Sequence, residues 1–155
     1  MEKVTSKYTI AKAALHSLQA ALFHIEHEQQ LTIEAITHPE ETTNQTKLIA
    51  RDSLIKRFEY TIDAFIKYVK EYVRVKLGAE YQFSKQLIRA LFAAKKIDAQ
   101  TCELLLDMVD DRNITAHSYL EIIANKIARK IPLYCKTMHH LLEKMNEDEK
   151  LWVKK

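Results

Sequence analysis

Apolar residues recur every three to four positions over long stretches of this chain, and such spacing predicts amphipathic helices. The first run predicts a helix over about residues 5–30, the most regular run predicts one over 47–77, and the last predicts one over 118–145. The stripe of the middle run is Ile55, Phe58, Ile62, Phe65, Val69 and Tyr72; that of the last is Ile123, Ile127, Ile131, Tyr134, Met138, Leu141 and Met145. Each stripe has the width that a helix of a bundle buries.

Two shorter apolar runs lie between these helices and predict helices over 84–95 and from residue 98 to Arg112. Ser84 and Asp98 carry side chains that commonly cap the start of a helix. Gly78 is the only glycine of the chain, and it is expected to end the preceding helix in a left-handed conformation. These signals separate five helices.

The last predicted helix contains a start signal and an internal proline. Ser118-x-x-Glu121 has the capping-box pattern and is expected to start the helix. Pro132 falls inside the helix, where it should cause a kink or remove one hydrogen bond. Residues 146–155 are polar and are expected to form a frayed tail behind a single domain of residues 1–145.

Composition narrows the fold class to all-α. The chain has 155 residues, 47% hydrophobic, with one Gly and two Pro. So few turn residues favour long helices with short connections, and we expect an up-and-down bundle of four to five helices. Two cysteines without a C-x-x-C pair, and no apolar window near the ~20 residues of a membrane span, predict a cytoplasmic protein without a membrane segment.

Charge is unevenly distributed although the net charge is only +3. Residues 67–96 carry eight Lys/Arg against two acids, whereas residues 97–121 carry Arg112 alone against six acids. A basic middle segment can form a phosphate-binding face. It can equally be the solvated face of a helix.

The stretch from Asp110 to Tyr119 holds the candidate chemistry. On one continuous helix Arg112 and His117 would point about 140° apart, so the two can converge only across a helix break. Asn113 and Thr115 lie between them, and both favour caps and turns over helix interiors. We therefore expect Arg112 to close one helix and His117 to precede the next.

These positions suit phosphodiester chemistry. A histidine at a helix N-terminus is pushed toward its neutral form, in which it can accept a proton from a ribose 2′-hydroxyl. Arg112 can hold the phosphate, and Asn113 can orient either group. Attack by the internal 2′-hydroxyl needs no metal and no cofactor, but it needs an acid as well as a base. Since each chain offers one His117 here, a homodimer is the natural arrangement.

The same residues carry a resemblance. Arg112-x-x-x-x-His117-x-Tyr119 resembles the R-x4-6-H motif of the HEPN superfamily, in the form found in HepT-type proteins. Arg51-Asp52-x-x-Ile55-x-Arg57-Phe58-Glu59-Tyr60-Thr61 is similar to the signature of the nucleotidyltransferase-substrate-binding protein family. Residues 8–145 follow that family in motif order. It often has Trp at the position of Ile66 and Gly at that of Ser53.

The resemblance implies a HEPN-like bundle that dimerises through its motif-bearing helices and pairs with a minimal nucleotidyltransferase. In one branch the helical protein is an RNase toxin, silenced when the partner adenylylates the motif tyrosine, here Tyr119. Arg112, His117 and Asn113 would then be catalytic, with RNA as substrate. Apart from the resemblance, Glu59, Asp63 and Arg57 are expected to support the cleft, but Glu59 and Asp63 can equally be a surface pair four residues apart within reach of Lys56 and Lys67.

Other interpretations fit the same residues. The protein can instead be the non-catalytic substrate-binding subunit of the nucleotidyltransferase, or a bundle whose loop only fixes its dimer. Arg112 and His117 can be a capping pair bound to Asp110 or Asp111, and Tyr119 a half-buried bundle residue. His24, His27 and Glu28 have ligand spacing, but without a second cluster in the sequence we predict no metal site.

Overall fold

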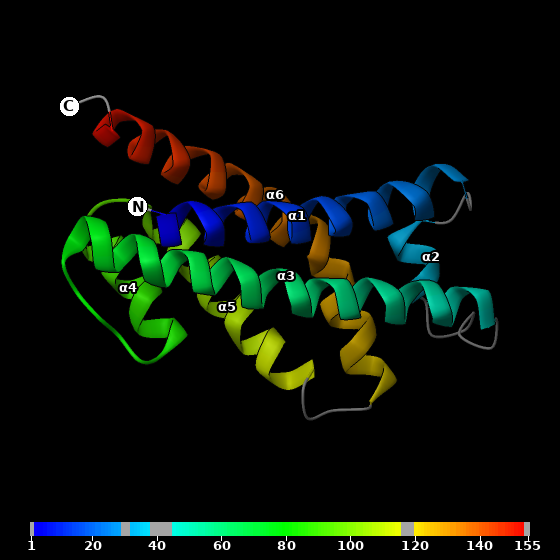
Figure 1. Cartoon of the computed structure of the whole chain (residues 1–155). Helices are drawn as coiled ribbons and strands as arrows, with labels where there is room; N and C mark the ends of the chain where they lie inside the picture. Colours follow the sequence, from blue (N-terminus) through cyan, green and yellow to red (C-terminus); the bar gives the residue numbers. More distant parts are fainter. Residues whose placement is uncertain (1, 29–31, 38–44, 116–119, 154–155) are drawn as a thin grey trace.

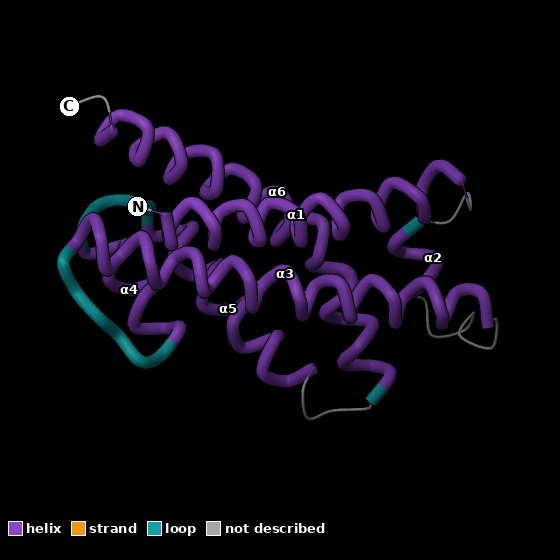
Figure 2. Tube along the Cα trace, viewed as in Figure 1, coloured by secondary structure: helices purple, strands orange, loops and turns teal. Residues whose placement is uncertain are grey.

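The computed structural model describes residues 2–28, 32–37, 45–115 and 120–153, and these residues form helices and their connections without a strand (Figure 2). The elements, in chain order, are α1 (Glu2–Phe23), a π-helical turn η1 (His24–Glu28), α2 (Ile33–Thr37), α3 (Gln45–Leu77), α4 (Ser84–Ala93), α5 (Ala99–Thr115) and α6 (Glu121–Val153). The all-α class predicted from the scarcity of turn residues is confirmed.

The long helices alternate in direction. In Figure 1, α1 runs away from the N-terminus, α3 returns beside it, α5 runs outward again behind α3, and α6 returns past α1. The short α4 packs on α5 and α3 at the end where α3 stops. This is an up-and-down bundle in which α3 touches every other long helix.

The predicted stripes form one hydrophobic core. Along α3, Phe58, Ile62, Phe65, Val69 and Tyr72 are buried, and along α6 so are Ile127, Ile131, Tyr134, Met138, Leu141 and Met145. The aromatic rings pack against each other, with Phe58 stacked on Tyr134 at 5.7 Å and Tyr8 tilted on Tyr68 at 5.5 Å between ring centroids. Such ring pairs add to the free energy gained from burial alone.

Two of the predicted helix-end signals, Gly78 and Asp98, are confirmed. Gly78 follows α3 with φ of 63°, the left-handed conformation expected of it. The Asp98 carboxylate accepts a hydrogen bond of 2.7 Å from the backbone N–H of Thr101 and so caps α5. The Ser84 cap was wrong: Phe83 holds the N-cap position of α4, and the Gln86 side chain accepts a hydrogen bond from its backbone N–H.

The last helix is longer than predicted. We expected it to stop near Met145, but α6 continues to Val153 (Figure 1). Asp148 explains part of the difference, because its carboxylate accepts a hydrogen bond of 3.0 Å from the Tyr72 hydroxyl and lies 3.7 Å from the Lys96 ammonium. Pro132 lies inside α6, which changes direction near its middle.

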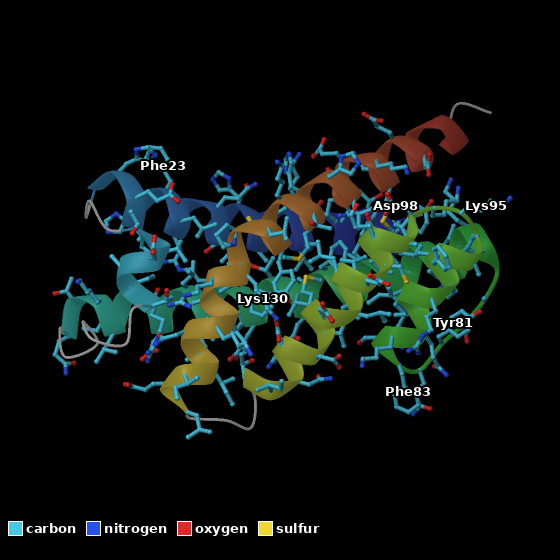
Figure 3. The ribbon with its side chains drawn as sticks, turned by 180° about the vertical axis from the view of Figure 1, so that it is seen from behind. Phe23, Tyr81, Phe83, Lys95, Asp98 and Lys130 are labelled. Atoms are coloured by element: carbon cyan, nitrogen blue, oxygen red, sulfur yellow. The ribbon has the colours of Figure 1, made fainter. Side chains whose placement is uncertain are left out.

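The first α-helix ends earlier than predicted. It stays α-helical only to Phe23 and then continues as the π-helical turn of residues His24–Glu28. Figure 3 shows Phe23 standing away from the bundle at this end of α1, where its ring contacts that of His27 at 4.3 Å. The short α2 was not predicted at all. No helix in the described part of the chain is long and apolar enough to cross a membrane.

Candidate functional site

Arg112 lies in the last turn of α5 and faces α3. We expected Arg112 to close this helix, but α5 continues through Asn113 to Thr115, three residues further. Its guanidinium makes a bidentate contact to Asp63, with Nε and Nη2 each 3.0 Å from a different carboxylate oxygen. Nη1 lies 3.8 Å from the Glu59 carboxylate, one helical turn earlier on α3. Arg112 is thus held by two acids that lie about fifty positions away in the sequence.

This arrangement fixes the charge of Arg112. The hydrogen bonds that it donates to Asp63 raise the pKa of Arg112 above its ordinary value, and the charges of Asp63 and Glu59 add to this against the opposing effect of burial. The dipole of α5 also favours a cation at its C-terminal end. Arg112 therefore stays a cation whose fork-shaped donors are turned toward oxygen acceptors.

The neighbouring acids have partners of their own. Asp110 pairs with Lys85 at the start of α4, at 2.5 Å. Asp111 accepts a hydrogen bond of 2.5 Å from the buried Tyr134 hydroxyl and lies 3.2 Å from the Lys130 ammonium. Arg112 is therefore not capped by Asp110 or Asp111, which was one alternative from the sequence.

The contact between Asp111 and α6 has a structural role. Figure 3 shows Lys130 on α6 close to α5. Burial raises the pKa of Tyr134 first of all, and the hydrogen bond to Asp111 raises it further, so the hydroxyl keeps its proton. This buried contact fixes the last turns of α5 against α6 and so sets the direction in which Arg112 leaves the helix.

Two hollows lie near the end of α5, and Arg112 lines the first of them. One, of about 380 Å³, lies between α3, α4 and α5 and is lined by Asp63, Lys67, Ser84, Arg112 and Asn113 with apolar side chains below. The other, of about 220 Å³, lies between α3, the end of α5 and the start of α6, and Glu59 and Thr115 are among its walls. Asn113 is exposed, so its amide is available to a bound molecule.

The structure brings together only part of the predicted site. Arg112, Asn113, Glu59 and Asp63 gather at the end of α5. His117 and Tyr119 lie outside the described residues, as does Ser118 of the predicted capping box. The convergence of Arg112 with His117 therefore stays a prediction.

Arg57 lies elsewhere. Its Nη1 donates to the backbone carbonyl and the hydroxyl of Ser17, at 3.0 and 3.1 Å, and so ties α3 to α1. It lines a hollow of about 820 Å³ together with His16 of α1 and His24 of η1. That hollow is wide and mostly walled by exposed side chains, and it lies away from Arg112. Arg57 therefore supports the α1–α3 packing and not the cleft.

One contact beside the site was not predicted. Arg51 is buried on α3, and its Nη1 donates a hydrogen bond of 3.0 Å to the side-chain oxygen of buried Asn125 on α6. Asp52 accepts two more hydrogen bonds from the same guanidinium. The pair sets the first turns of α6 against α3, below the smaller hollow. A charged residue on the apolar side of a helix was the one sequence signal for it.

A family model described as "Nucleotidyltransferase substrate binding protein like" matches residues 6–147. The chain belongs to this family. No match was found among curated proteins.

Solved structures agree on the fold. A protein from Thermus thermophilus is 32% identical, with a TM-score of 0.69 over 87% of this chain and 98% of that one. The MntA-HpeT toxin-antitoxin is 16% identical over 95% of this chain and 99% of that one, with a TM-score of 0.66. A tri-AMPylated HEPN toxin of Shewanella oneidensis, in complex with an MNT antitoxin, is 15% identical over 89% and 97%, with a TM-score of 0.64. The bundle is therefore HEPN-like.

Proposed function

We propose that this protein is a HEPN-type toxin that cleaves RNA and is controlled by a minimal nucleotidyltransferase antitoxin. The observation that carries the proposal is the placing of Arg112, a permanent cation in the last turn of α5, on the wall of an open hollow that Asn113 also lines. The family and the fold support it, since the two structural neighbours named above as toxins are solved with antitoxins or as toxin-antitoxin pairs.

The proposed reaction uses the RNA as its own nucleophile. The 2′-oxygen bonds to the adjacent phosphorus, the bond from phosphorus to the 5′-oxygen breaks, and a cyclic phosphate and a 5′-hydroxyl result. His117 of one copy takes the 2′-hydroxyl proton, and His117 of a second copy gives a proton to the leaving 5′-oxygen. Arg112 stabilises the charge that builds on the phosphate oxygens, and Asn113 orients the phosphate. The site is therefore proposed to form in a homodimer.

Cleavage of a labelled RNA by purified protein tests the proposal. Arg112→Ala should lower the rate about 100- to 1000-fold, as loss of a preorganised charge donor does. Arg112→Lys keeps the charge but loses the fork, so it should recover only part of the rate. His117→Ala should be at least about 100-fold slower. Equal rates for wild type and His117→Ala would rule out the proposal that this protein is a ribonuclease that uses His117.

A second role is proposed for Tyr119 as the residue that the partner modifies. The tri-AMPylated toxin of Shewanella oneidensis carries AMP groups in its complex with the antitoxin. Intact-mass measurement after co-expression with a neighbouring nucleotidyltransferase should show adenylyl additions, and Tyr119→Phe should remove at least one. A non-catalytic substrate-binding subunit would show the additions without any RNA cleavage, with or without the partner.

A further inference from the structure

A row of basic side chains lies beside the candidate site on α3 and α1. Lys67, Lys70 and Arg74 follow one another at helical spacing along α3, and Lys3 and Lys7 face them from α1, which lies alongside α3 (Figure 1). We call these five residues the basic furrow. It carries five positive charges, with Glu71 and Glu80 as the acids among its lining residues.

The furrow is continuous with the Arg112 site. Three hollows follow one another over the outward face of α3, of about 380, 290 and 380 Å³. The first two share Asp63 and Lys67 among their walls, and the last two share Lys7 and Lys67. Lys67 lines all three. The three hollows therefore adjoin one another between the furrow and Arg112.

Along this path the acids already have ion-pair partners, whereas three of the lysines are in none of the ion pairs of the described residues. Glu71 is occupied by Lys3 at 3.2 Å and by Arg74 at 3.0 Å, and Asp63 is occupied by Arg112. Within the part of the chain that the structure describes, none of the ion pairs involves Lys7, Lys67 or Lys70. Lys67 and Lys70 are exposed, and their ammonium groups are available to an anion.

An exposed aromatic ring lies in the hollow between the furrow and the Arg112 site. Tyr60 is 60% exposed and lines the middle hollow together with Ile10. The ammonium of Lys56 lies 5.5 Å from the centre of its ring. Proteins that bind single strands combine a cationic groove with exposed aromatic rings on which bases stack. From Tyr60 to Arg74 the path along α3 is about 21 Å long, enough for several nucleotides.

We propose that the basic furrow is the binding track that leads single-stranded RNA to Arg112. This inference rests on the proposed function for the identity of the polymer, but binding along the track does not depend on cleavage. Lys7, Lys67 and Lys70 contact successive phosphates, and Tyr60 stacks on a base. An acidic protein surface would match the charge, but it would need neither Tyr60 nor the continuity with Arg112.

The test measures binding to a fluorescent oligouridine of about ten nucleotides by anisotropy, with His117→Ala as the background so that no strand is cut. Lys67→Glu combined with Lys70→Glu should raise Kd at least tenfold and make the salt dependence shallower by about 1.4 in the logarithmic slope. The matched control is Lys126→Glu with Lys136→Glu, which makes the same change of charge at exposed positions of α6. Its Kd should stay within about twofold of the background protein.

Tyr60→Ala separates a track from general charge attraction. It should weaken the single strand about fivefold or more and leave a duplex of the same length unchanged, because only unpaired bases stack on the ring. Equal losses for the α3 and α6 variants would overturn the proposal. So would unchanged RNA binding together with loss of the nucleotidyltransferase complex, which would make the furrow a protein dock.

The two proposals fail in different ways. If the His117→Ala background binds RNA through the furrow but the wild type never cleaves it, the track stands and the ribonuclease does not. If the wild type cleaves and Lys67→Glu with Lys70→Glu changes neither Kd nor the rate, the ribonuclease stands and the track is wrong.

Discussion

Arg112 makes its strongest contacts to α3 and not to the acids beside it in sequence. Asp63 occupies two of its donors, and Glu59 lies near a third. A phosphate that is to be held by the same donors must therefore take the place of Asp63. This makes Asp63 a competitor of substrate as well as a support for the arginine.

Asp63→Asn should weaken the competing contact while leaving the shape of the side chain. Because Asp63 is 48% exposed, its pair with Arg112 contributes at most about 1 kcal/mol. We expect RNA cleavage or RNA affinity to rise up to about fivefold, with a slightly lower melting temperature. Asp110→Asn is the matched control, since Asp110 pairs with Lys85 instead. A fall in affinity for Asp63→Asn alone would show that Asp63 positions Arg112 for substrate.

Glu71 gives a prediction on pH. Burial by itself raises the pKa of Glu71, but hydrogen bonds from Arg74 and Lys3 outweigh it and hold the pKa below the ordinary 4.5. A lowered pKa in the folded state stabilises the protein above the ordinary pKa, and this contribution is lost as pH falls through the folded value. Wild type should therefore exceed Glu71→Gln in melting temperature at pH 7, and the gap should close below about pH 4.5. A gap that is independent of pH would contradict this.

At the scale of the elements, the end of α4 shows an uncommon choice of residue. Lys95 adopts φ of 59°, the left-handed conformation that Gly78 adopts after α3. The Lys96 N–H donates to the Leu91 carbonyl and the Lys95 N–H to the Phe92 carbonyl, at 2.9 and 3.0 Å. This is the Schellman pattern, in which glycine is favoured at the position of Lys95.

Lys95→Gly should therefore stabilise the protein. Relief of the left-handed strain is worth about 1 kcal/mol, and urea unfolding should show a higher midpoint with an unchanged slope. Lys95→Ala removes the side chain but keeps the strain, so it should be nearly neutral. If both variants shift the midpoint equally, the side chain and not the backbone decides the effect.

The elements show what could be predicted from sequence. The stripes of α3 and α6 were identified because apolar residues repeat with the helical period. Gly78 and Asp98 marked helix ends by their local chemistry alone. The extension of α6 depends on Asp148 meeting Tyr72 and Lys96, which lie far from it in the sequence. No local signal marked the π-helical turn at His24–Glu28, because a change of hydrogen-bond register needs no special residue.

The same distinction applies to the site. Arg112, Asn113, Glu59 and Asp63 were identified as candidates, and the structure brings them together. The pairing of Arg112 with Asp63, and not with Asp110 or Asp111, depends on how α5 packs on α3. Arg57 was wrongly assigned to the cleft. Its neighbours Phe58 and Glu59 lie on other faces of α3, and the hydrogen bond to Ser17 of α1 sets the direction of the Arg57 side chain.

At the scale of the whole molecule, the reactivity of the two cysteines depends on whether the helical bundle is closed. Cys102 of α5 and Cys135 of α6 are both buried and both unpaired. Burial raises the pKa of both thiols, that of Cys135 to about 11, so little of the reactive thiolate is present at neutral pH.

Labelling with a thiol reagent should therefore be slow in native buffer and rapid in guanidinium. Since each thiol is buried in the common core, both should become reactive together when the bundle opens. Cys102→Ser isolates the signal of Cys135. Rapid labelling of Cys135 in native buffer would show that α6 separates from the bundle on its own.

The pair between Arg112 and Asp63 also has a consequence for which anions can occupy the site. A tethered carboxylate is present at a high effective concentration, so a small ion with a single point of contact displaces it poorly. A polymer held at several points by the neighbouring lysines gains avidity and can displace it. A mononucleotide should accordingly inhibit RNA cleavage only weakly, and longer oligonucleotides progressively better, so that the built-in acid selects for chain length.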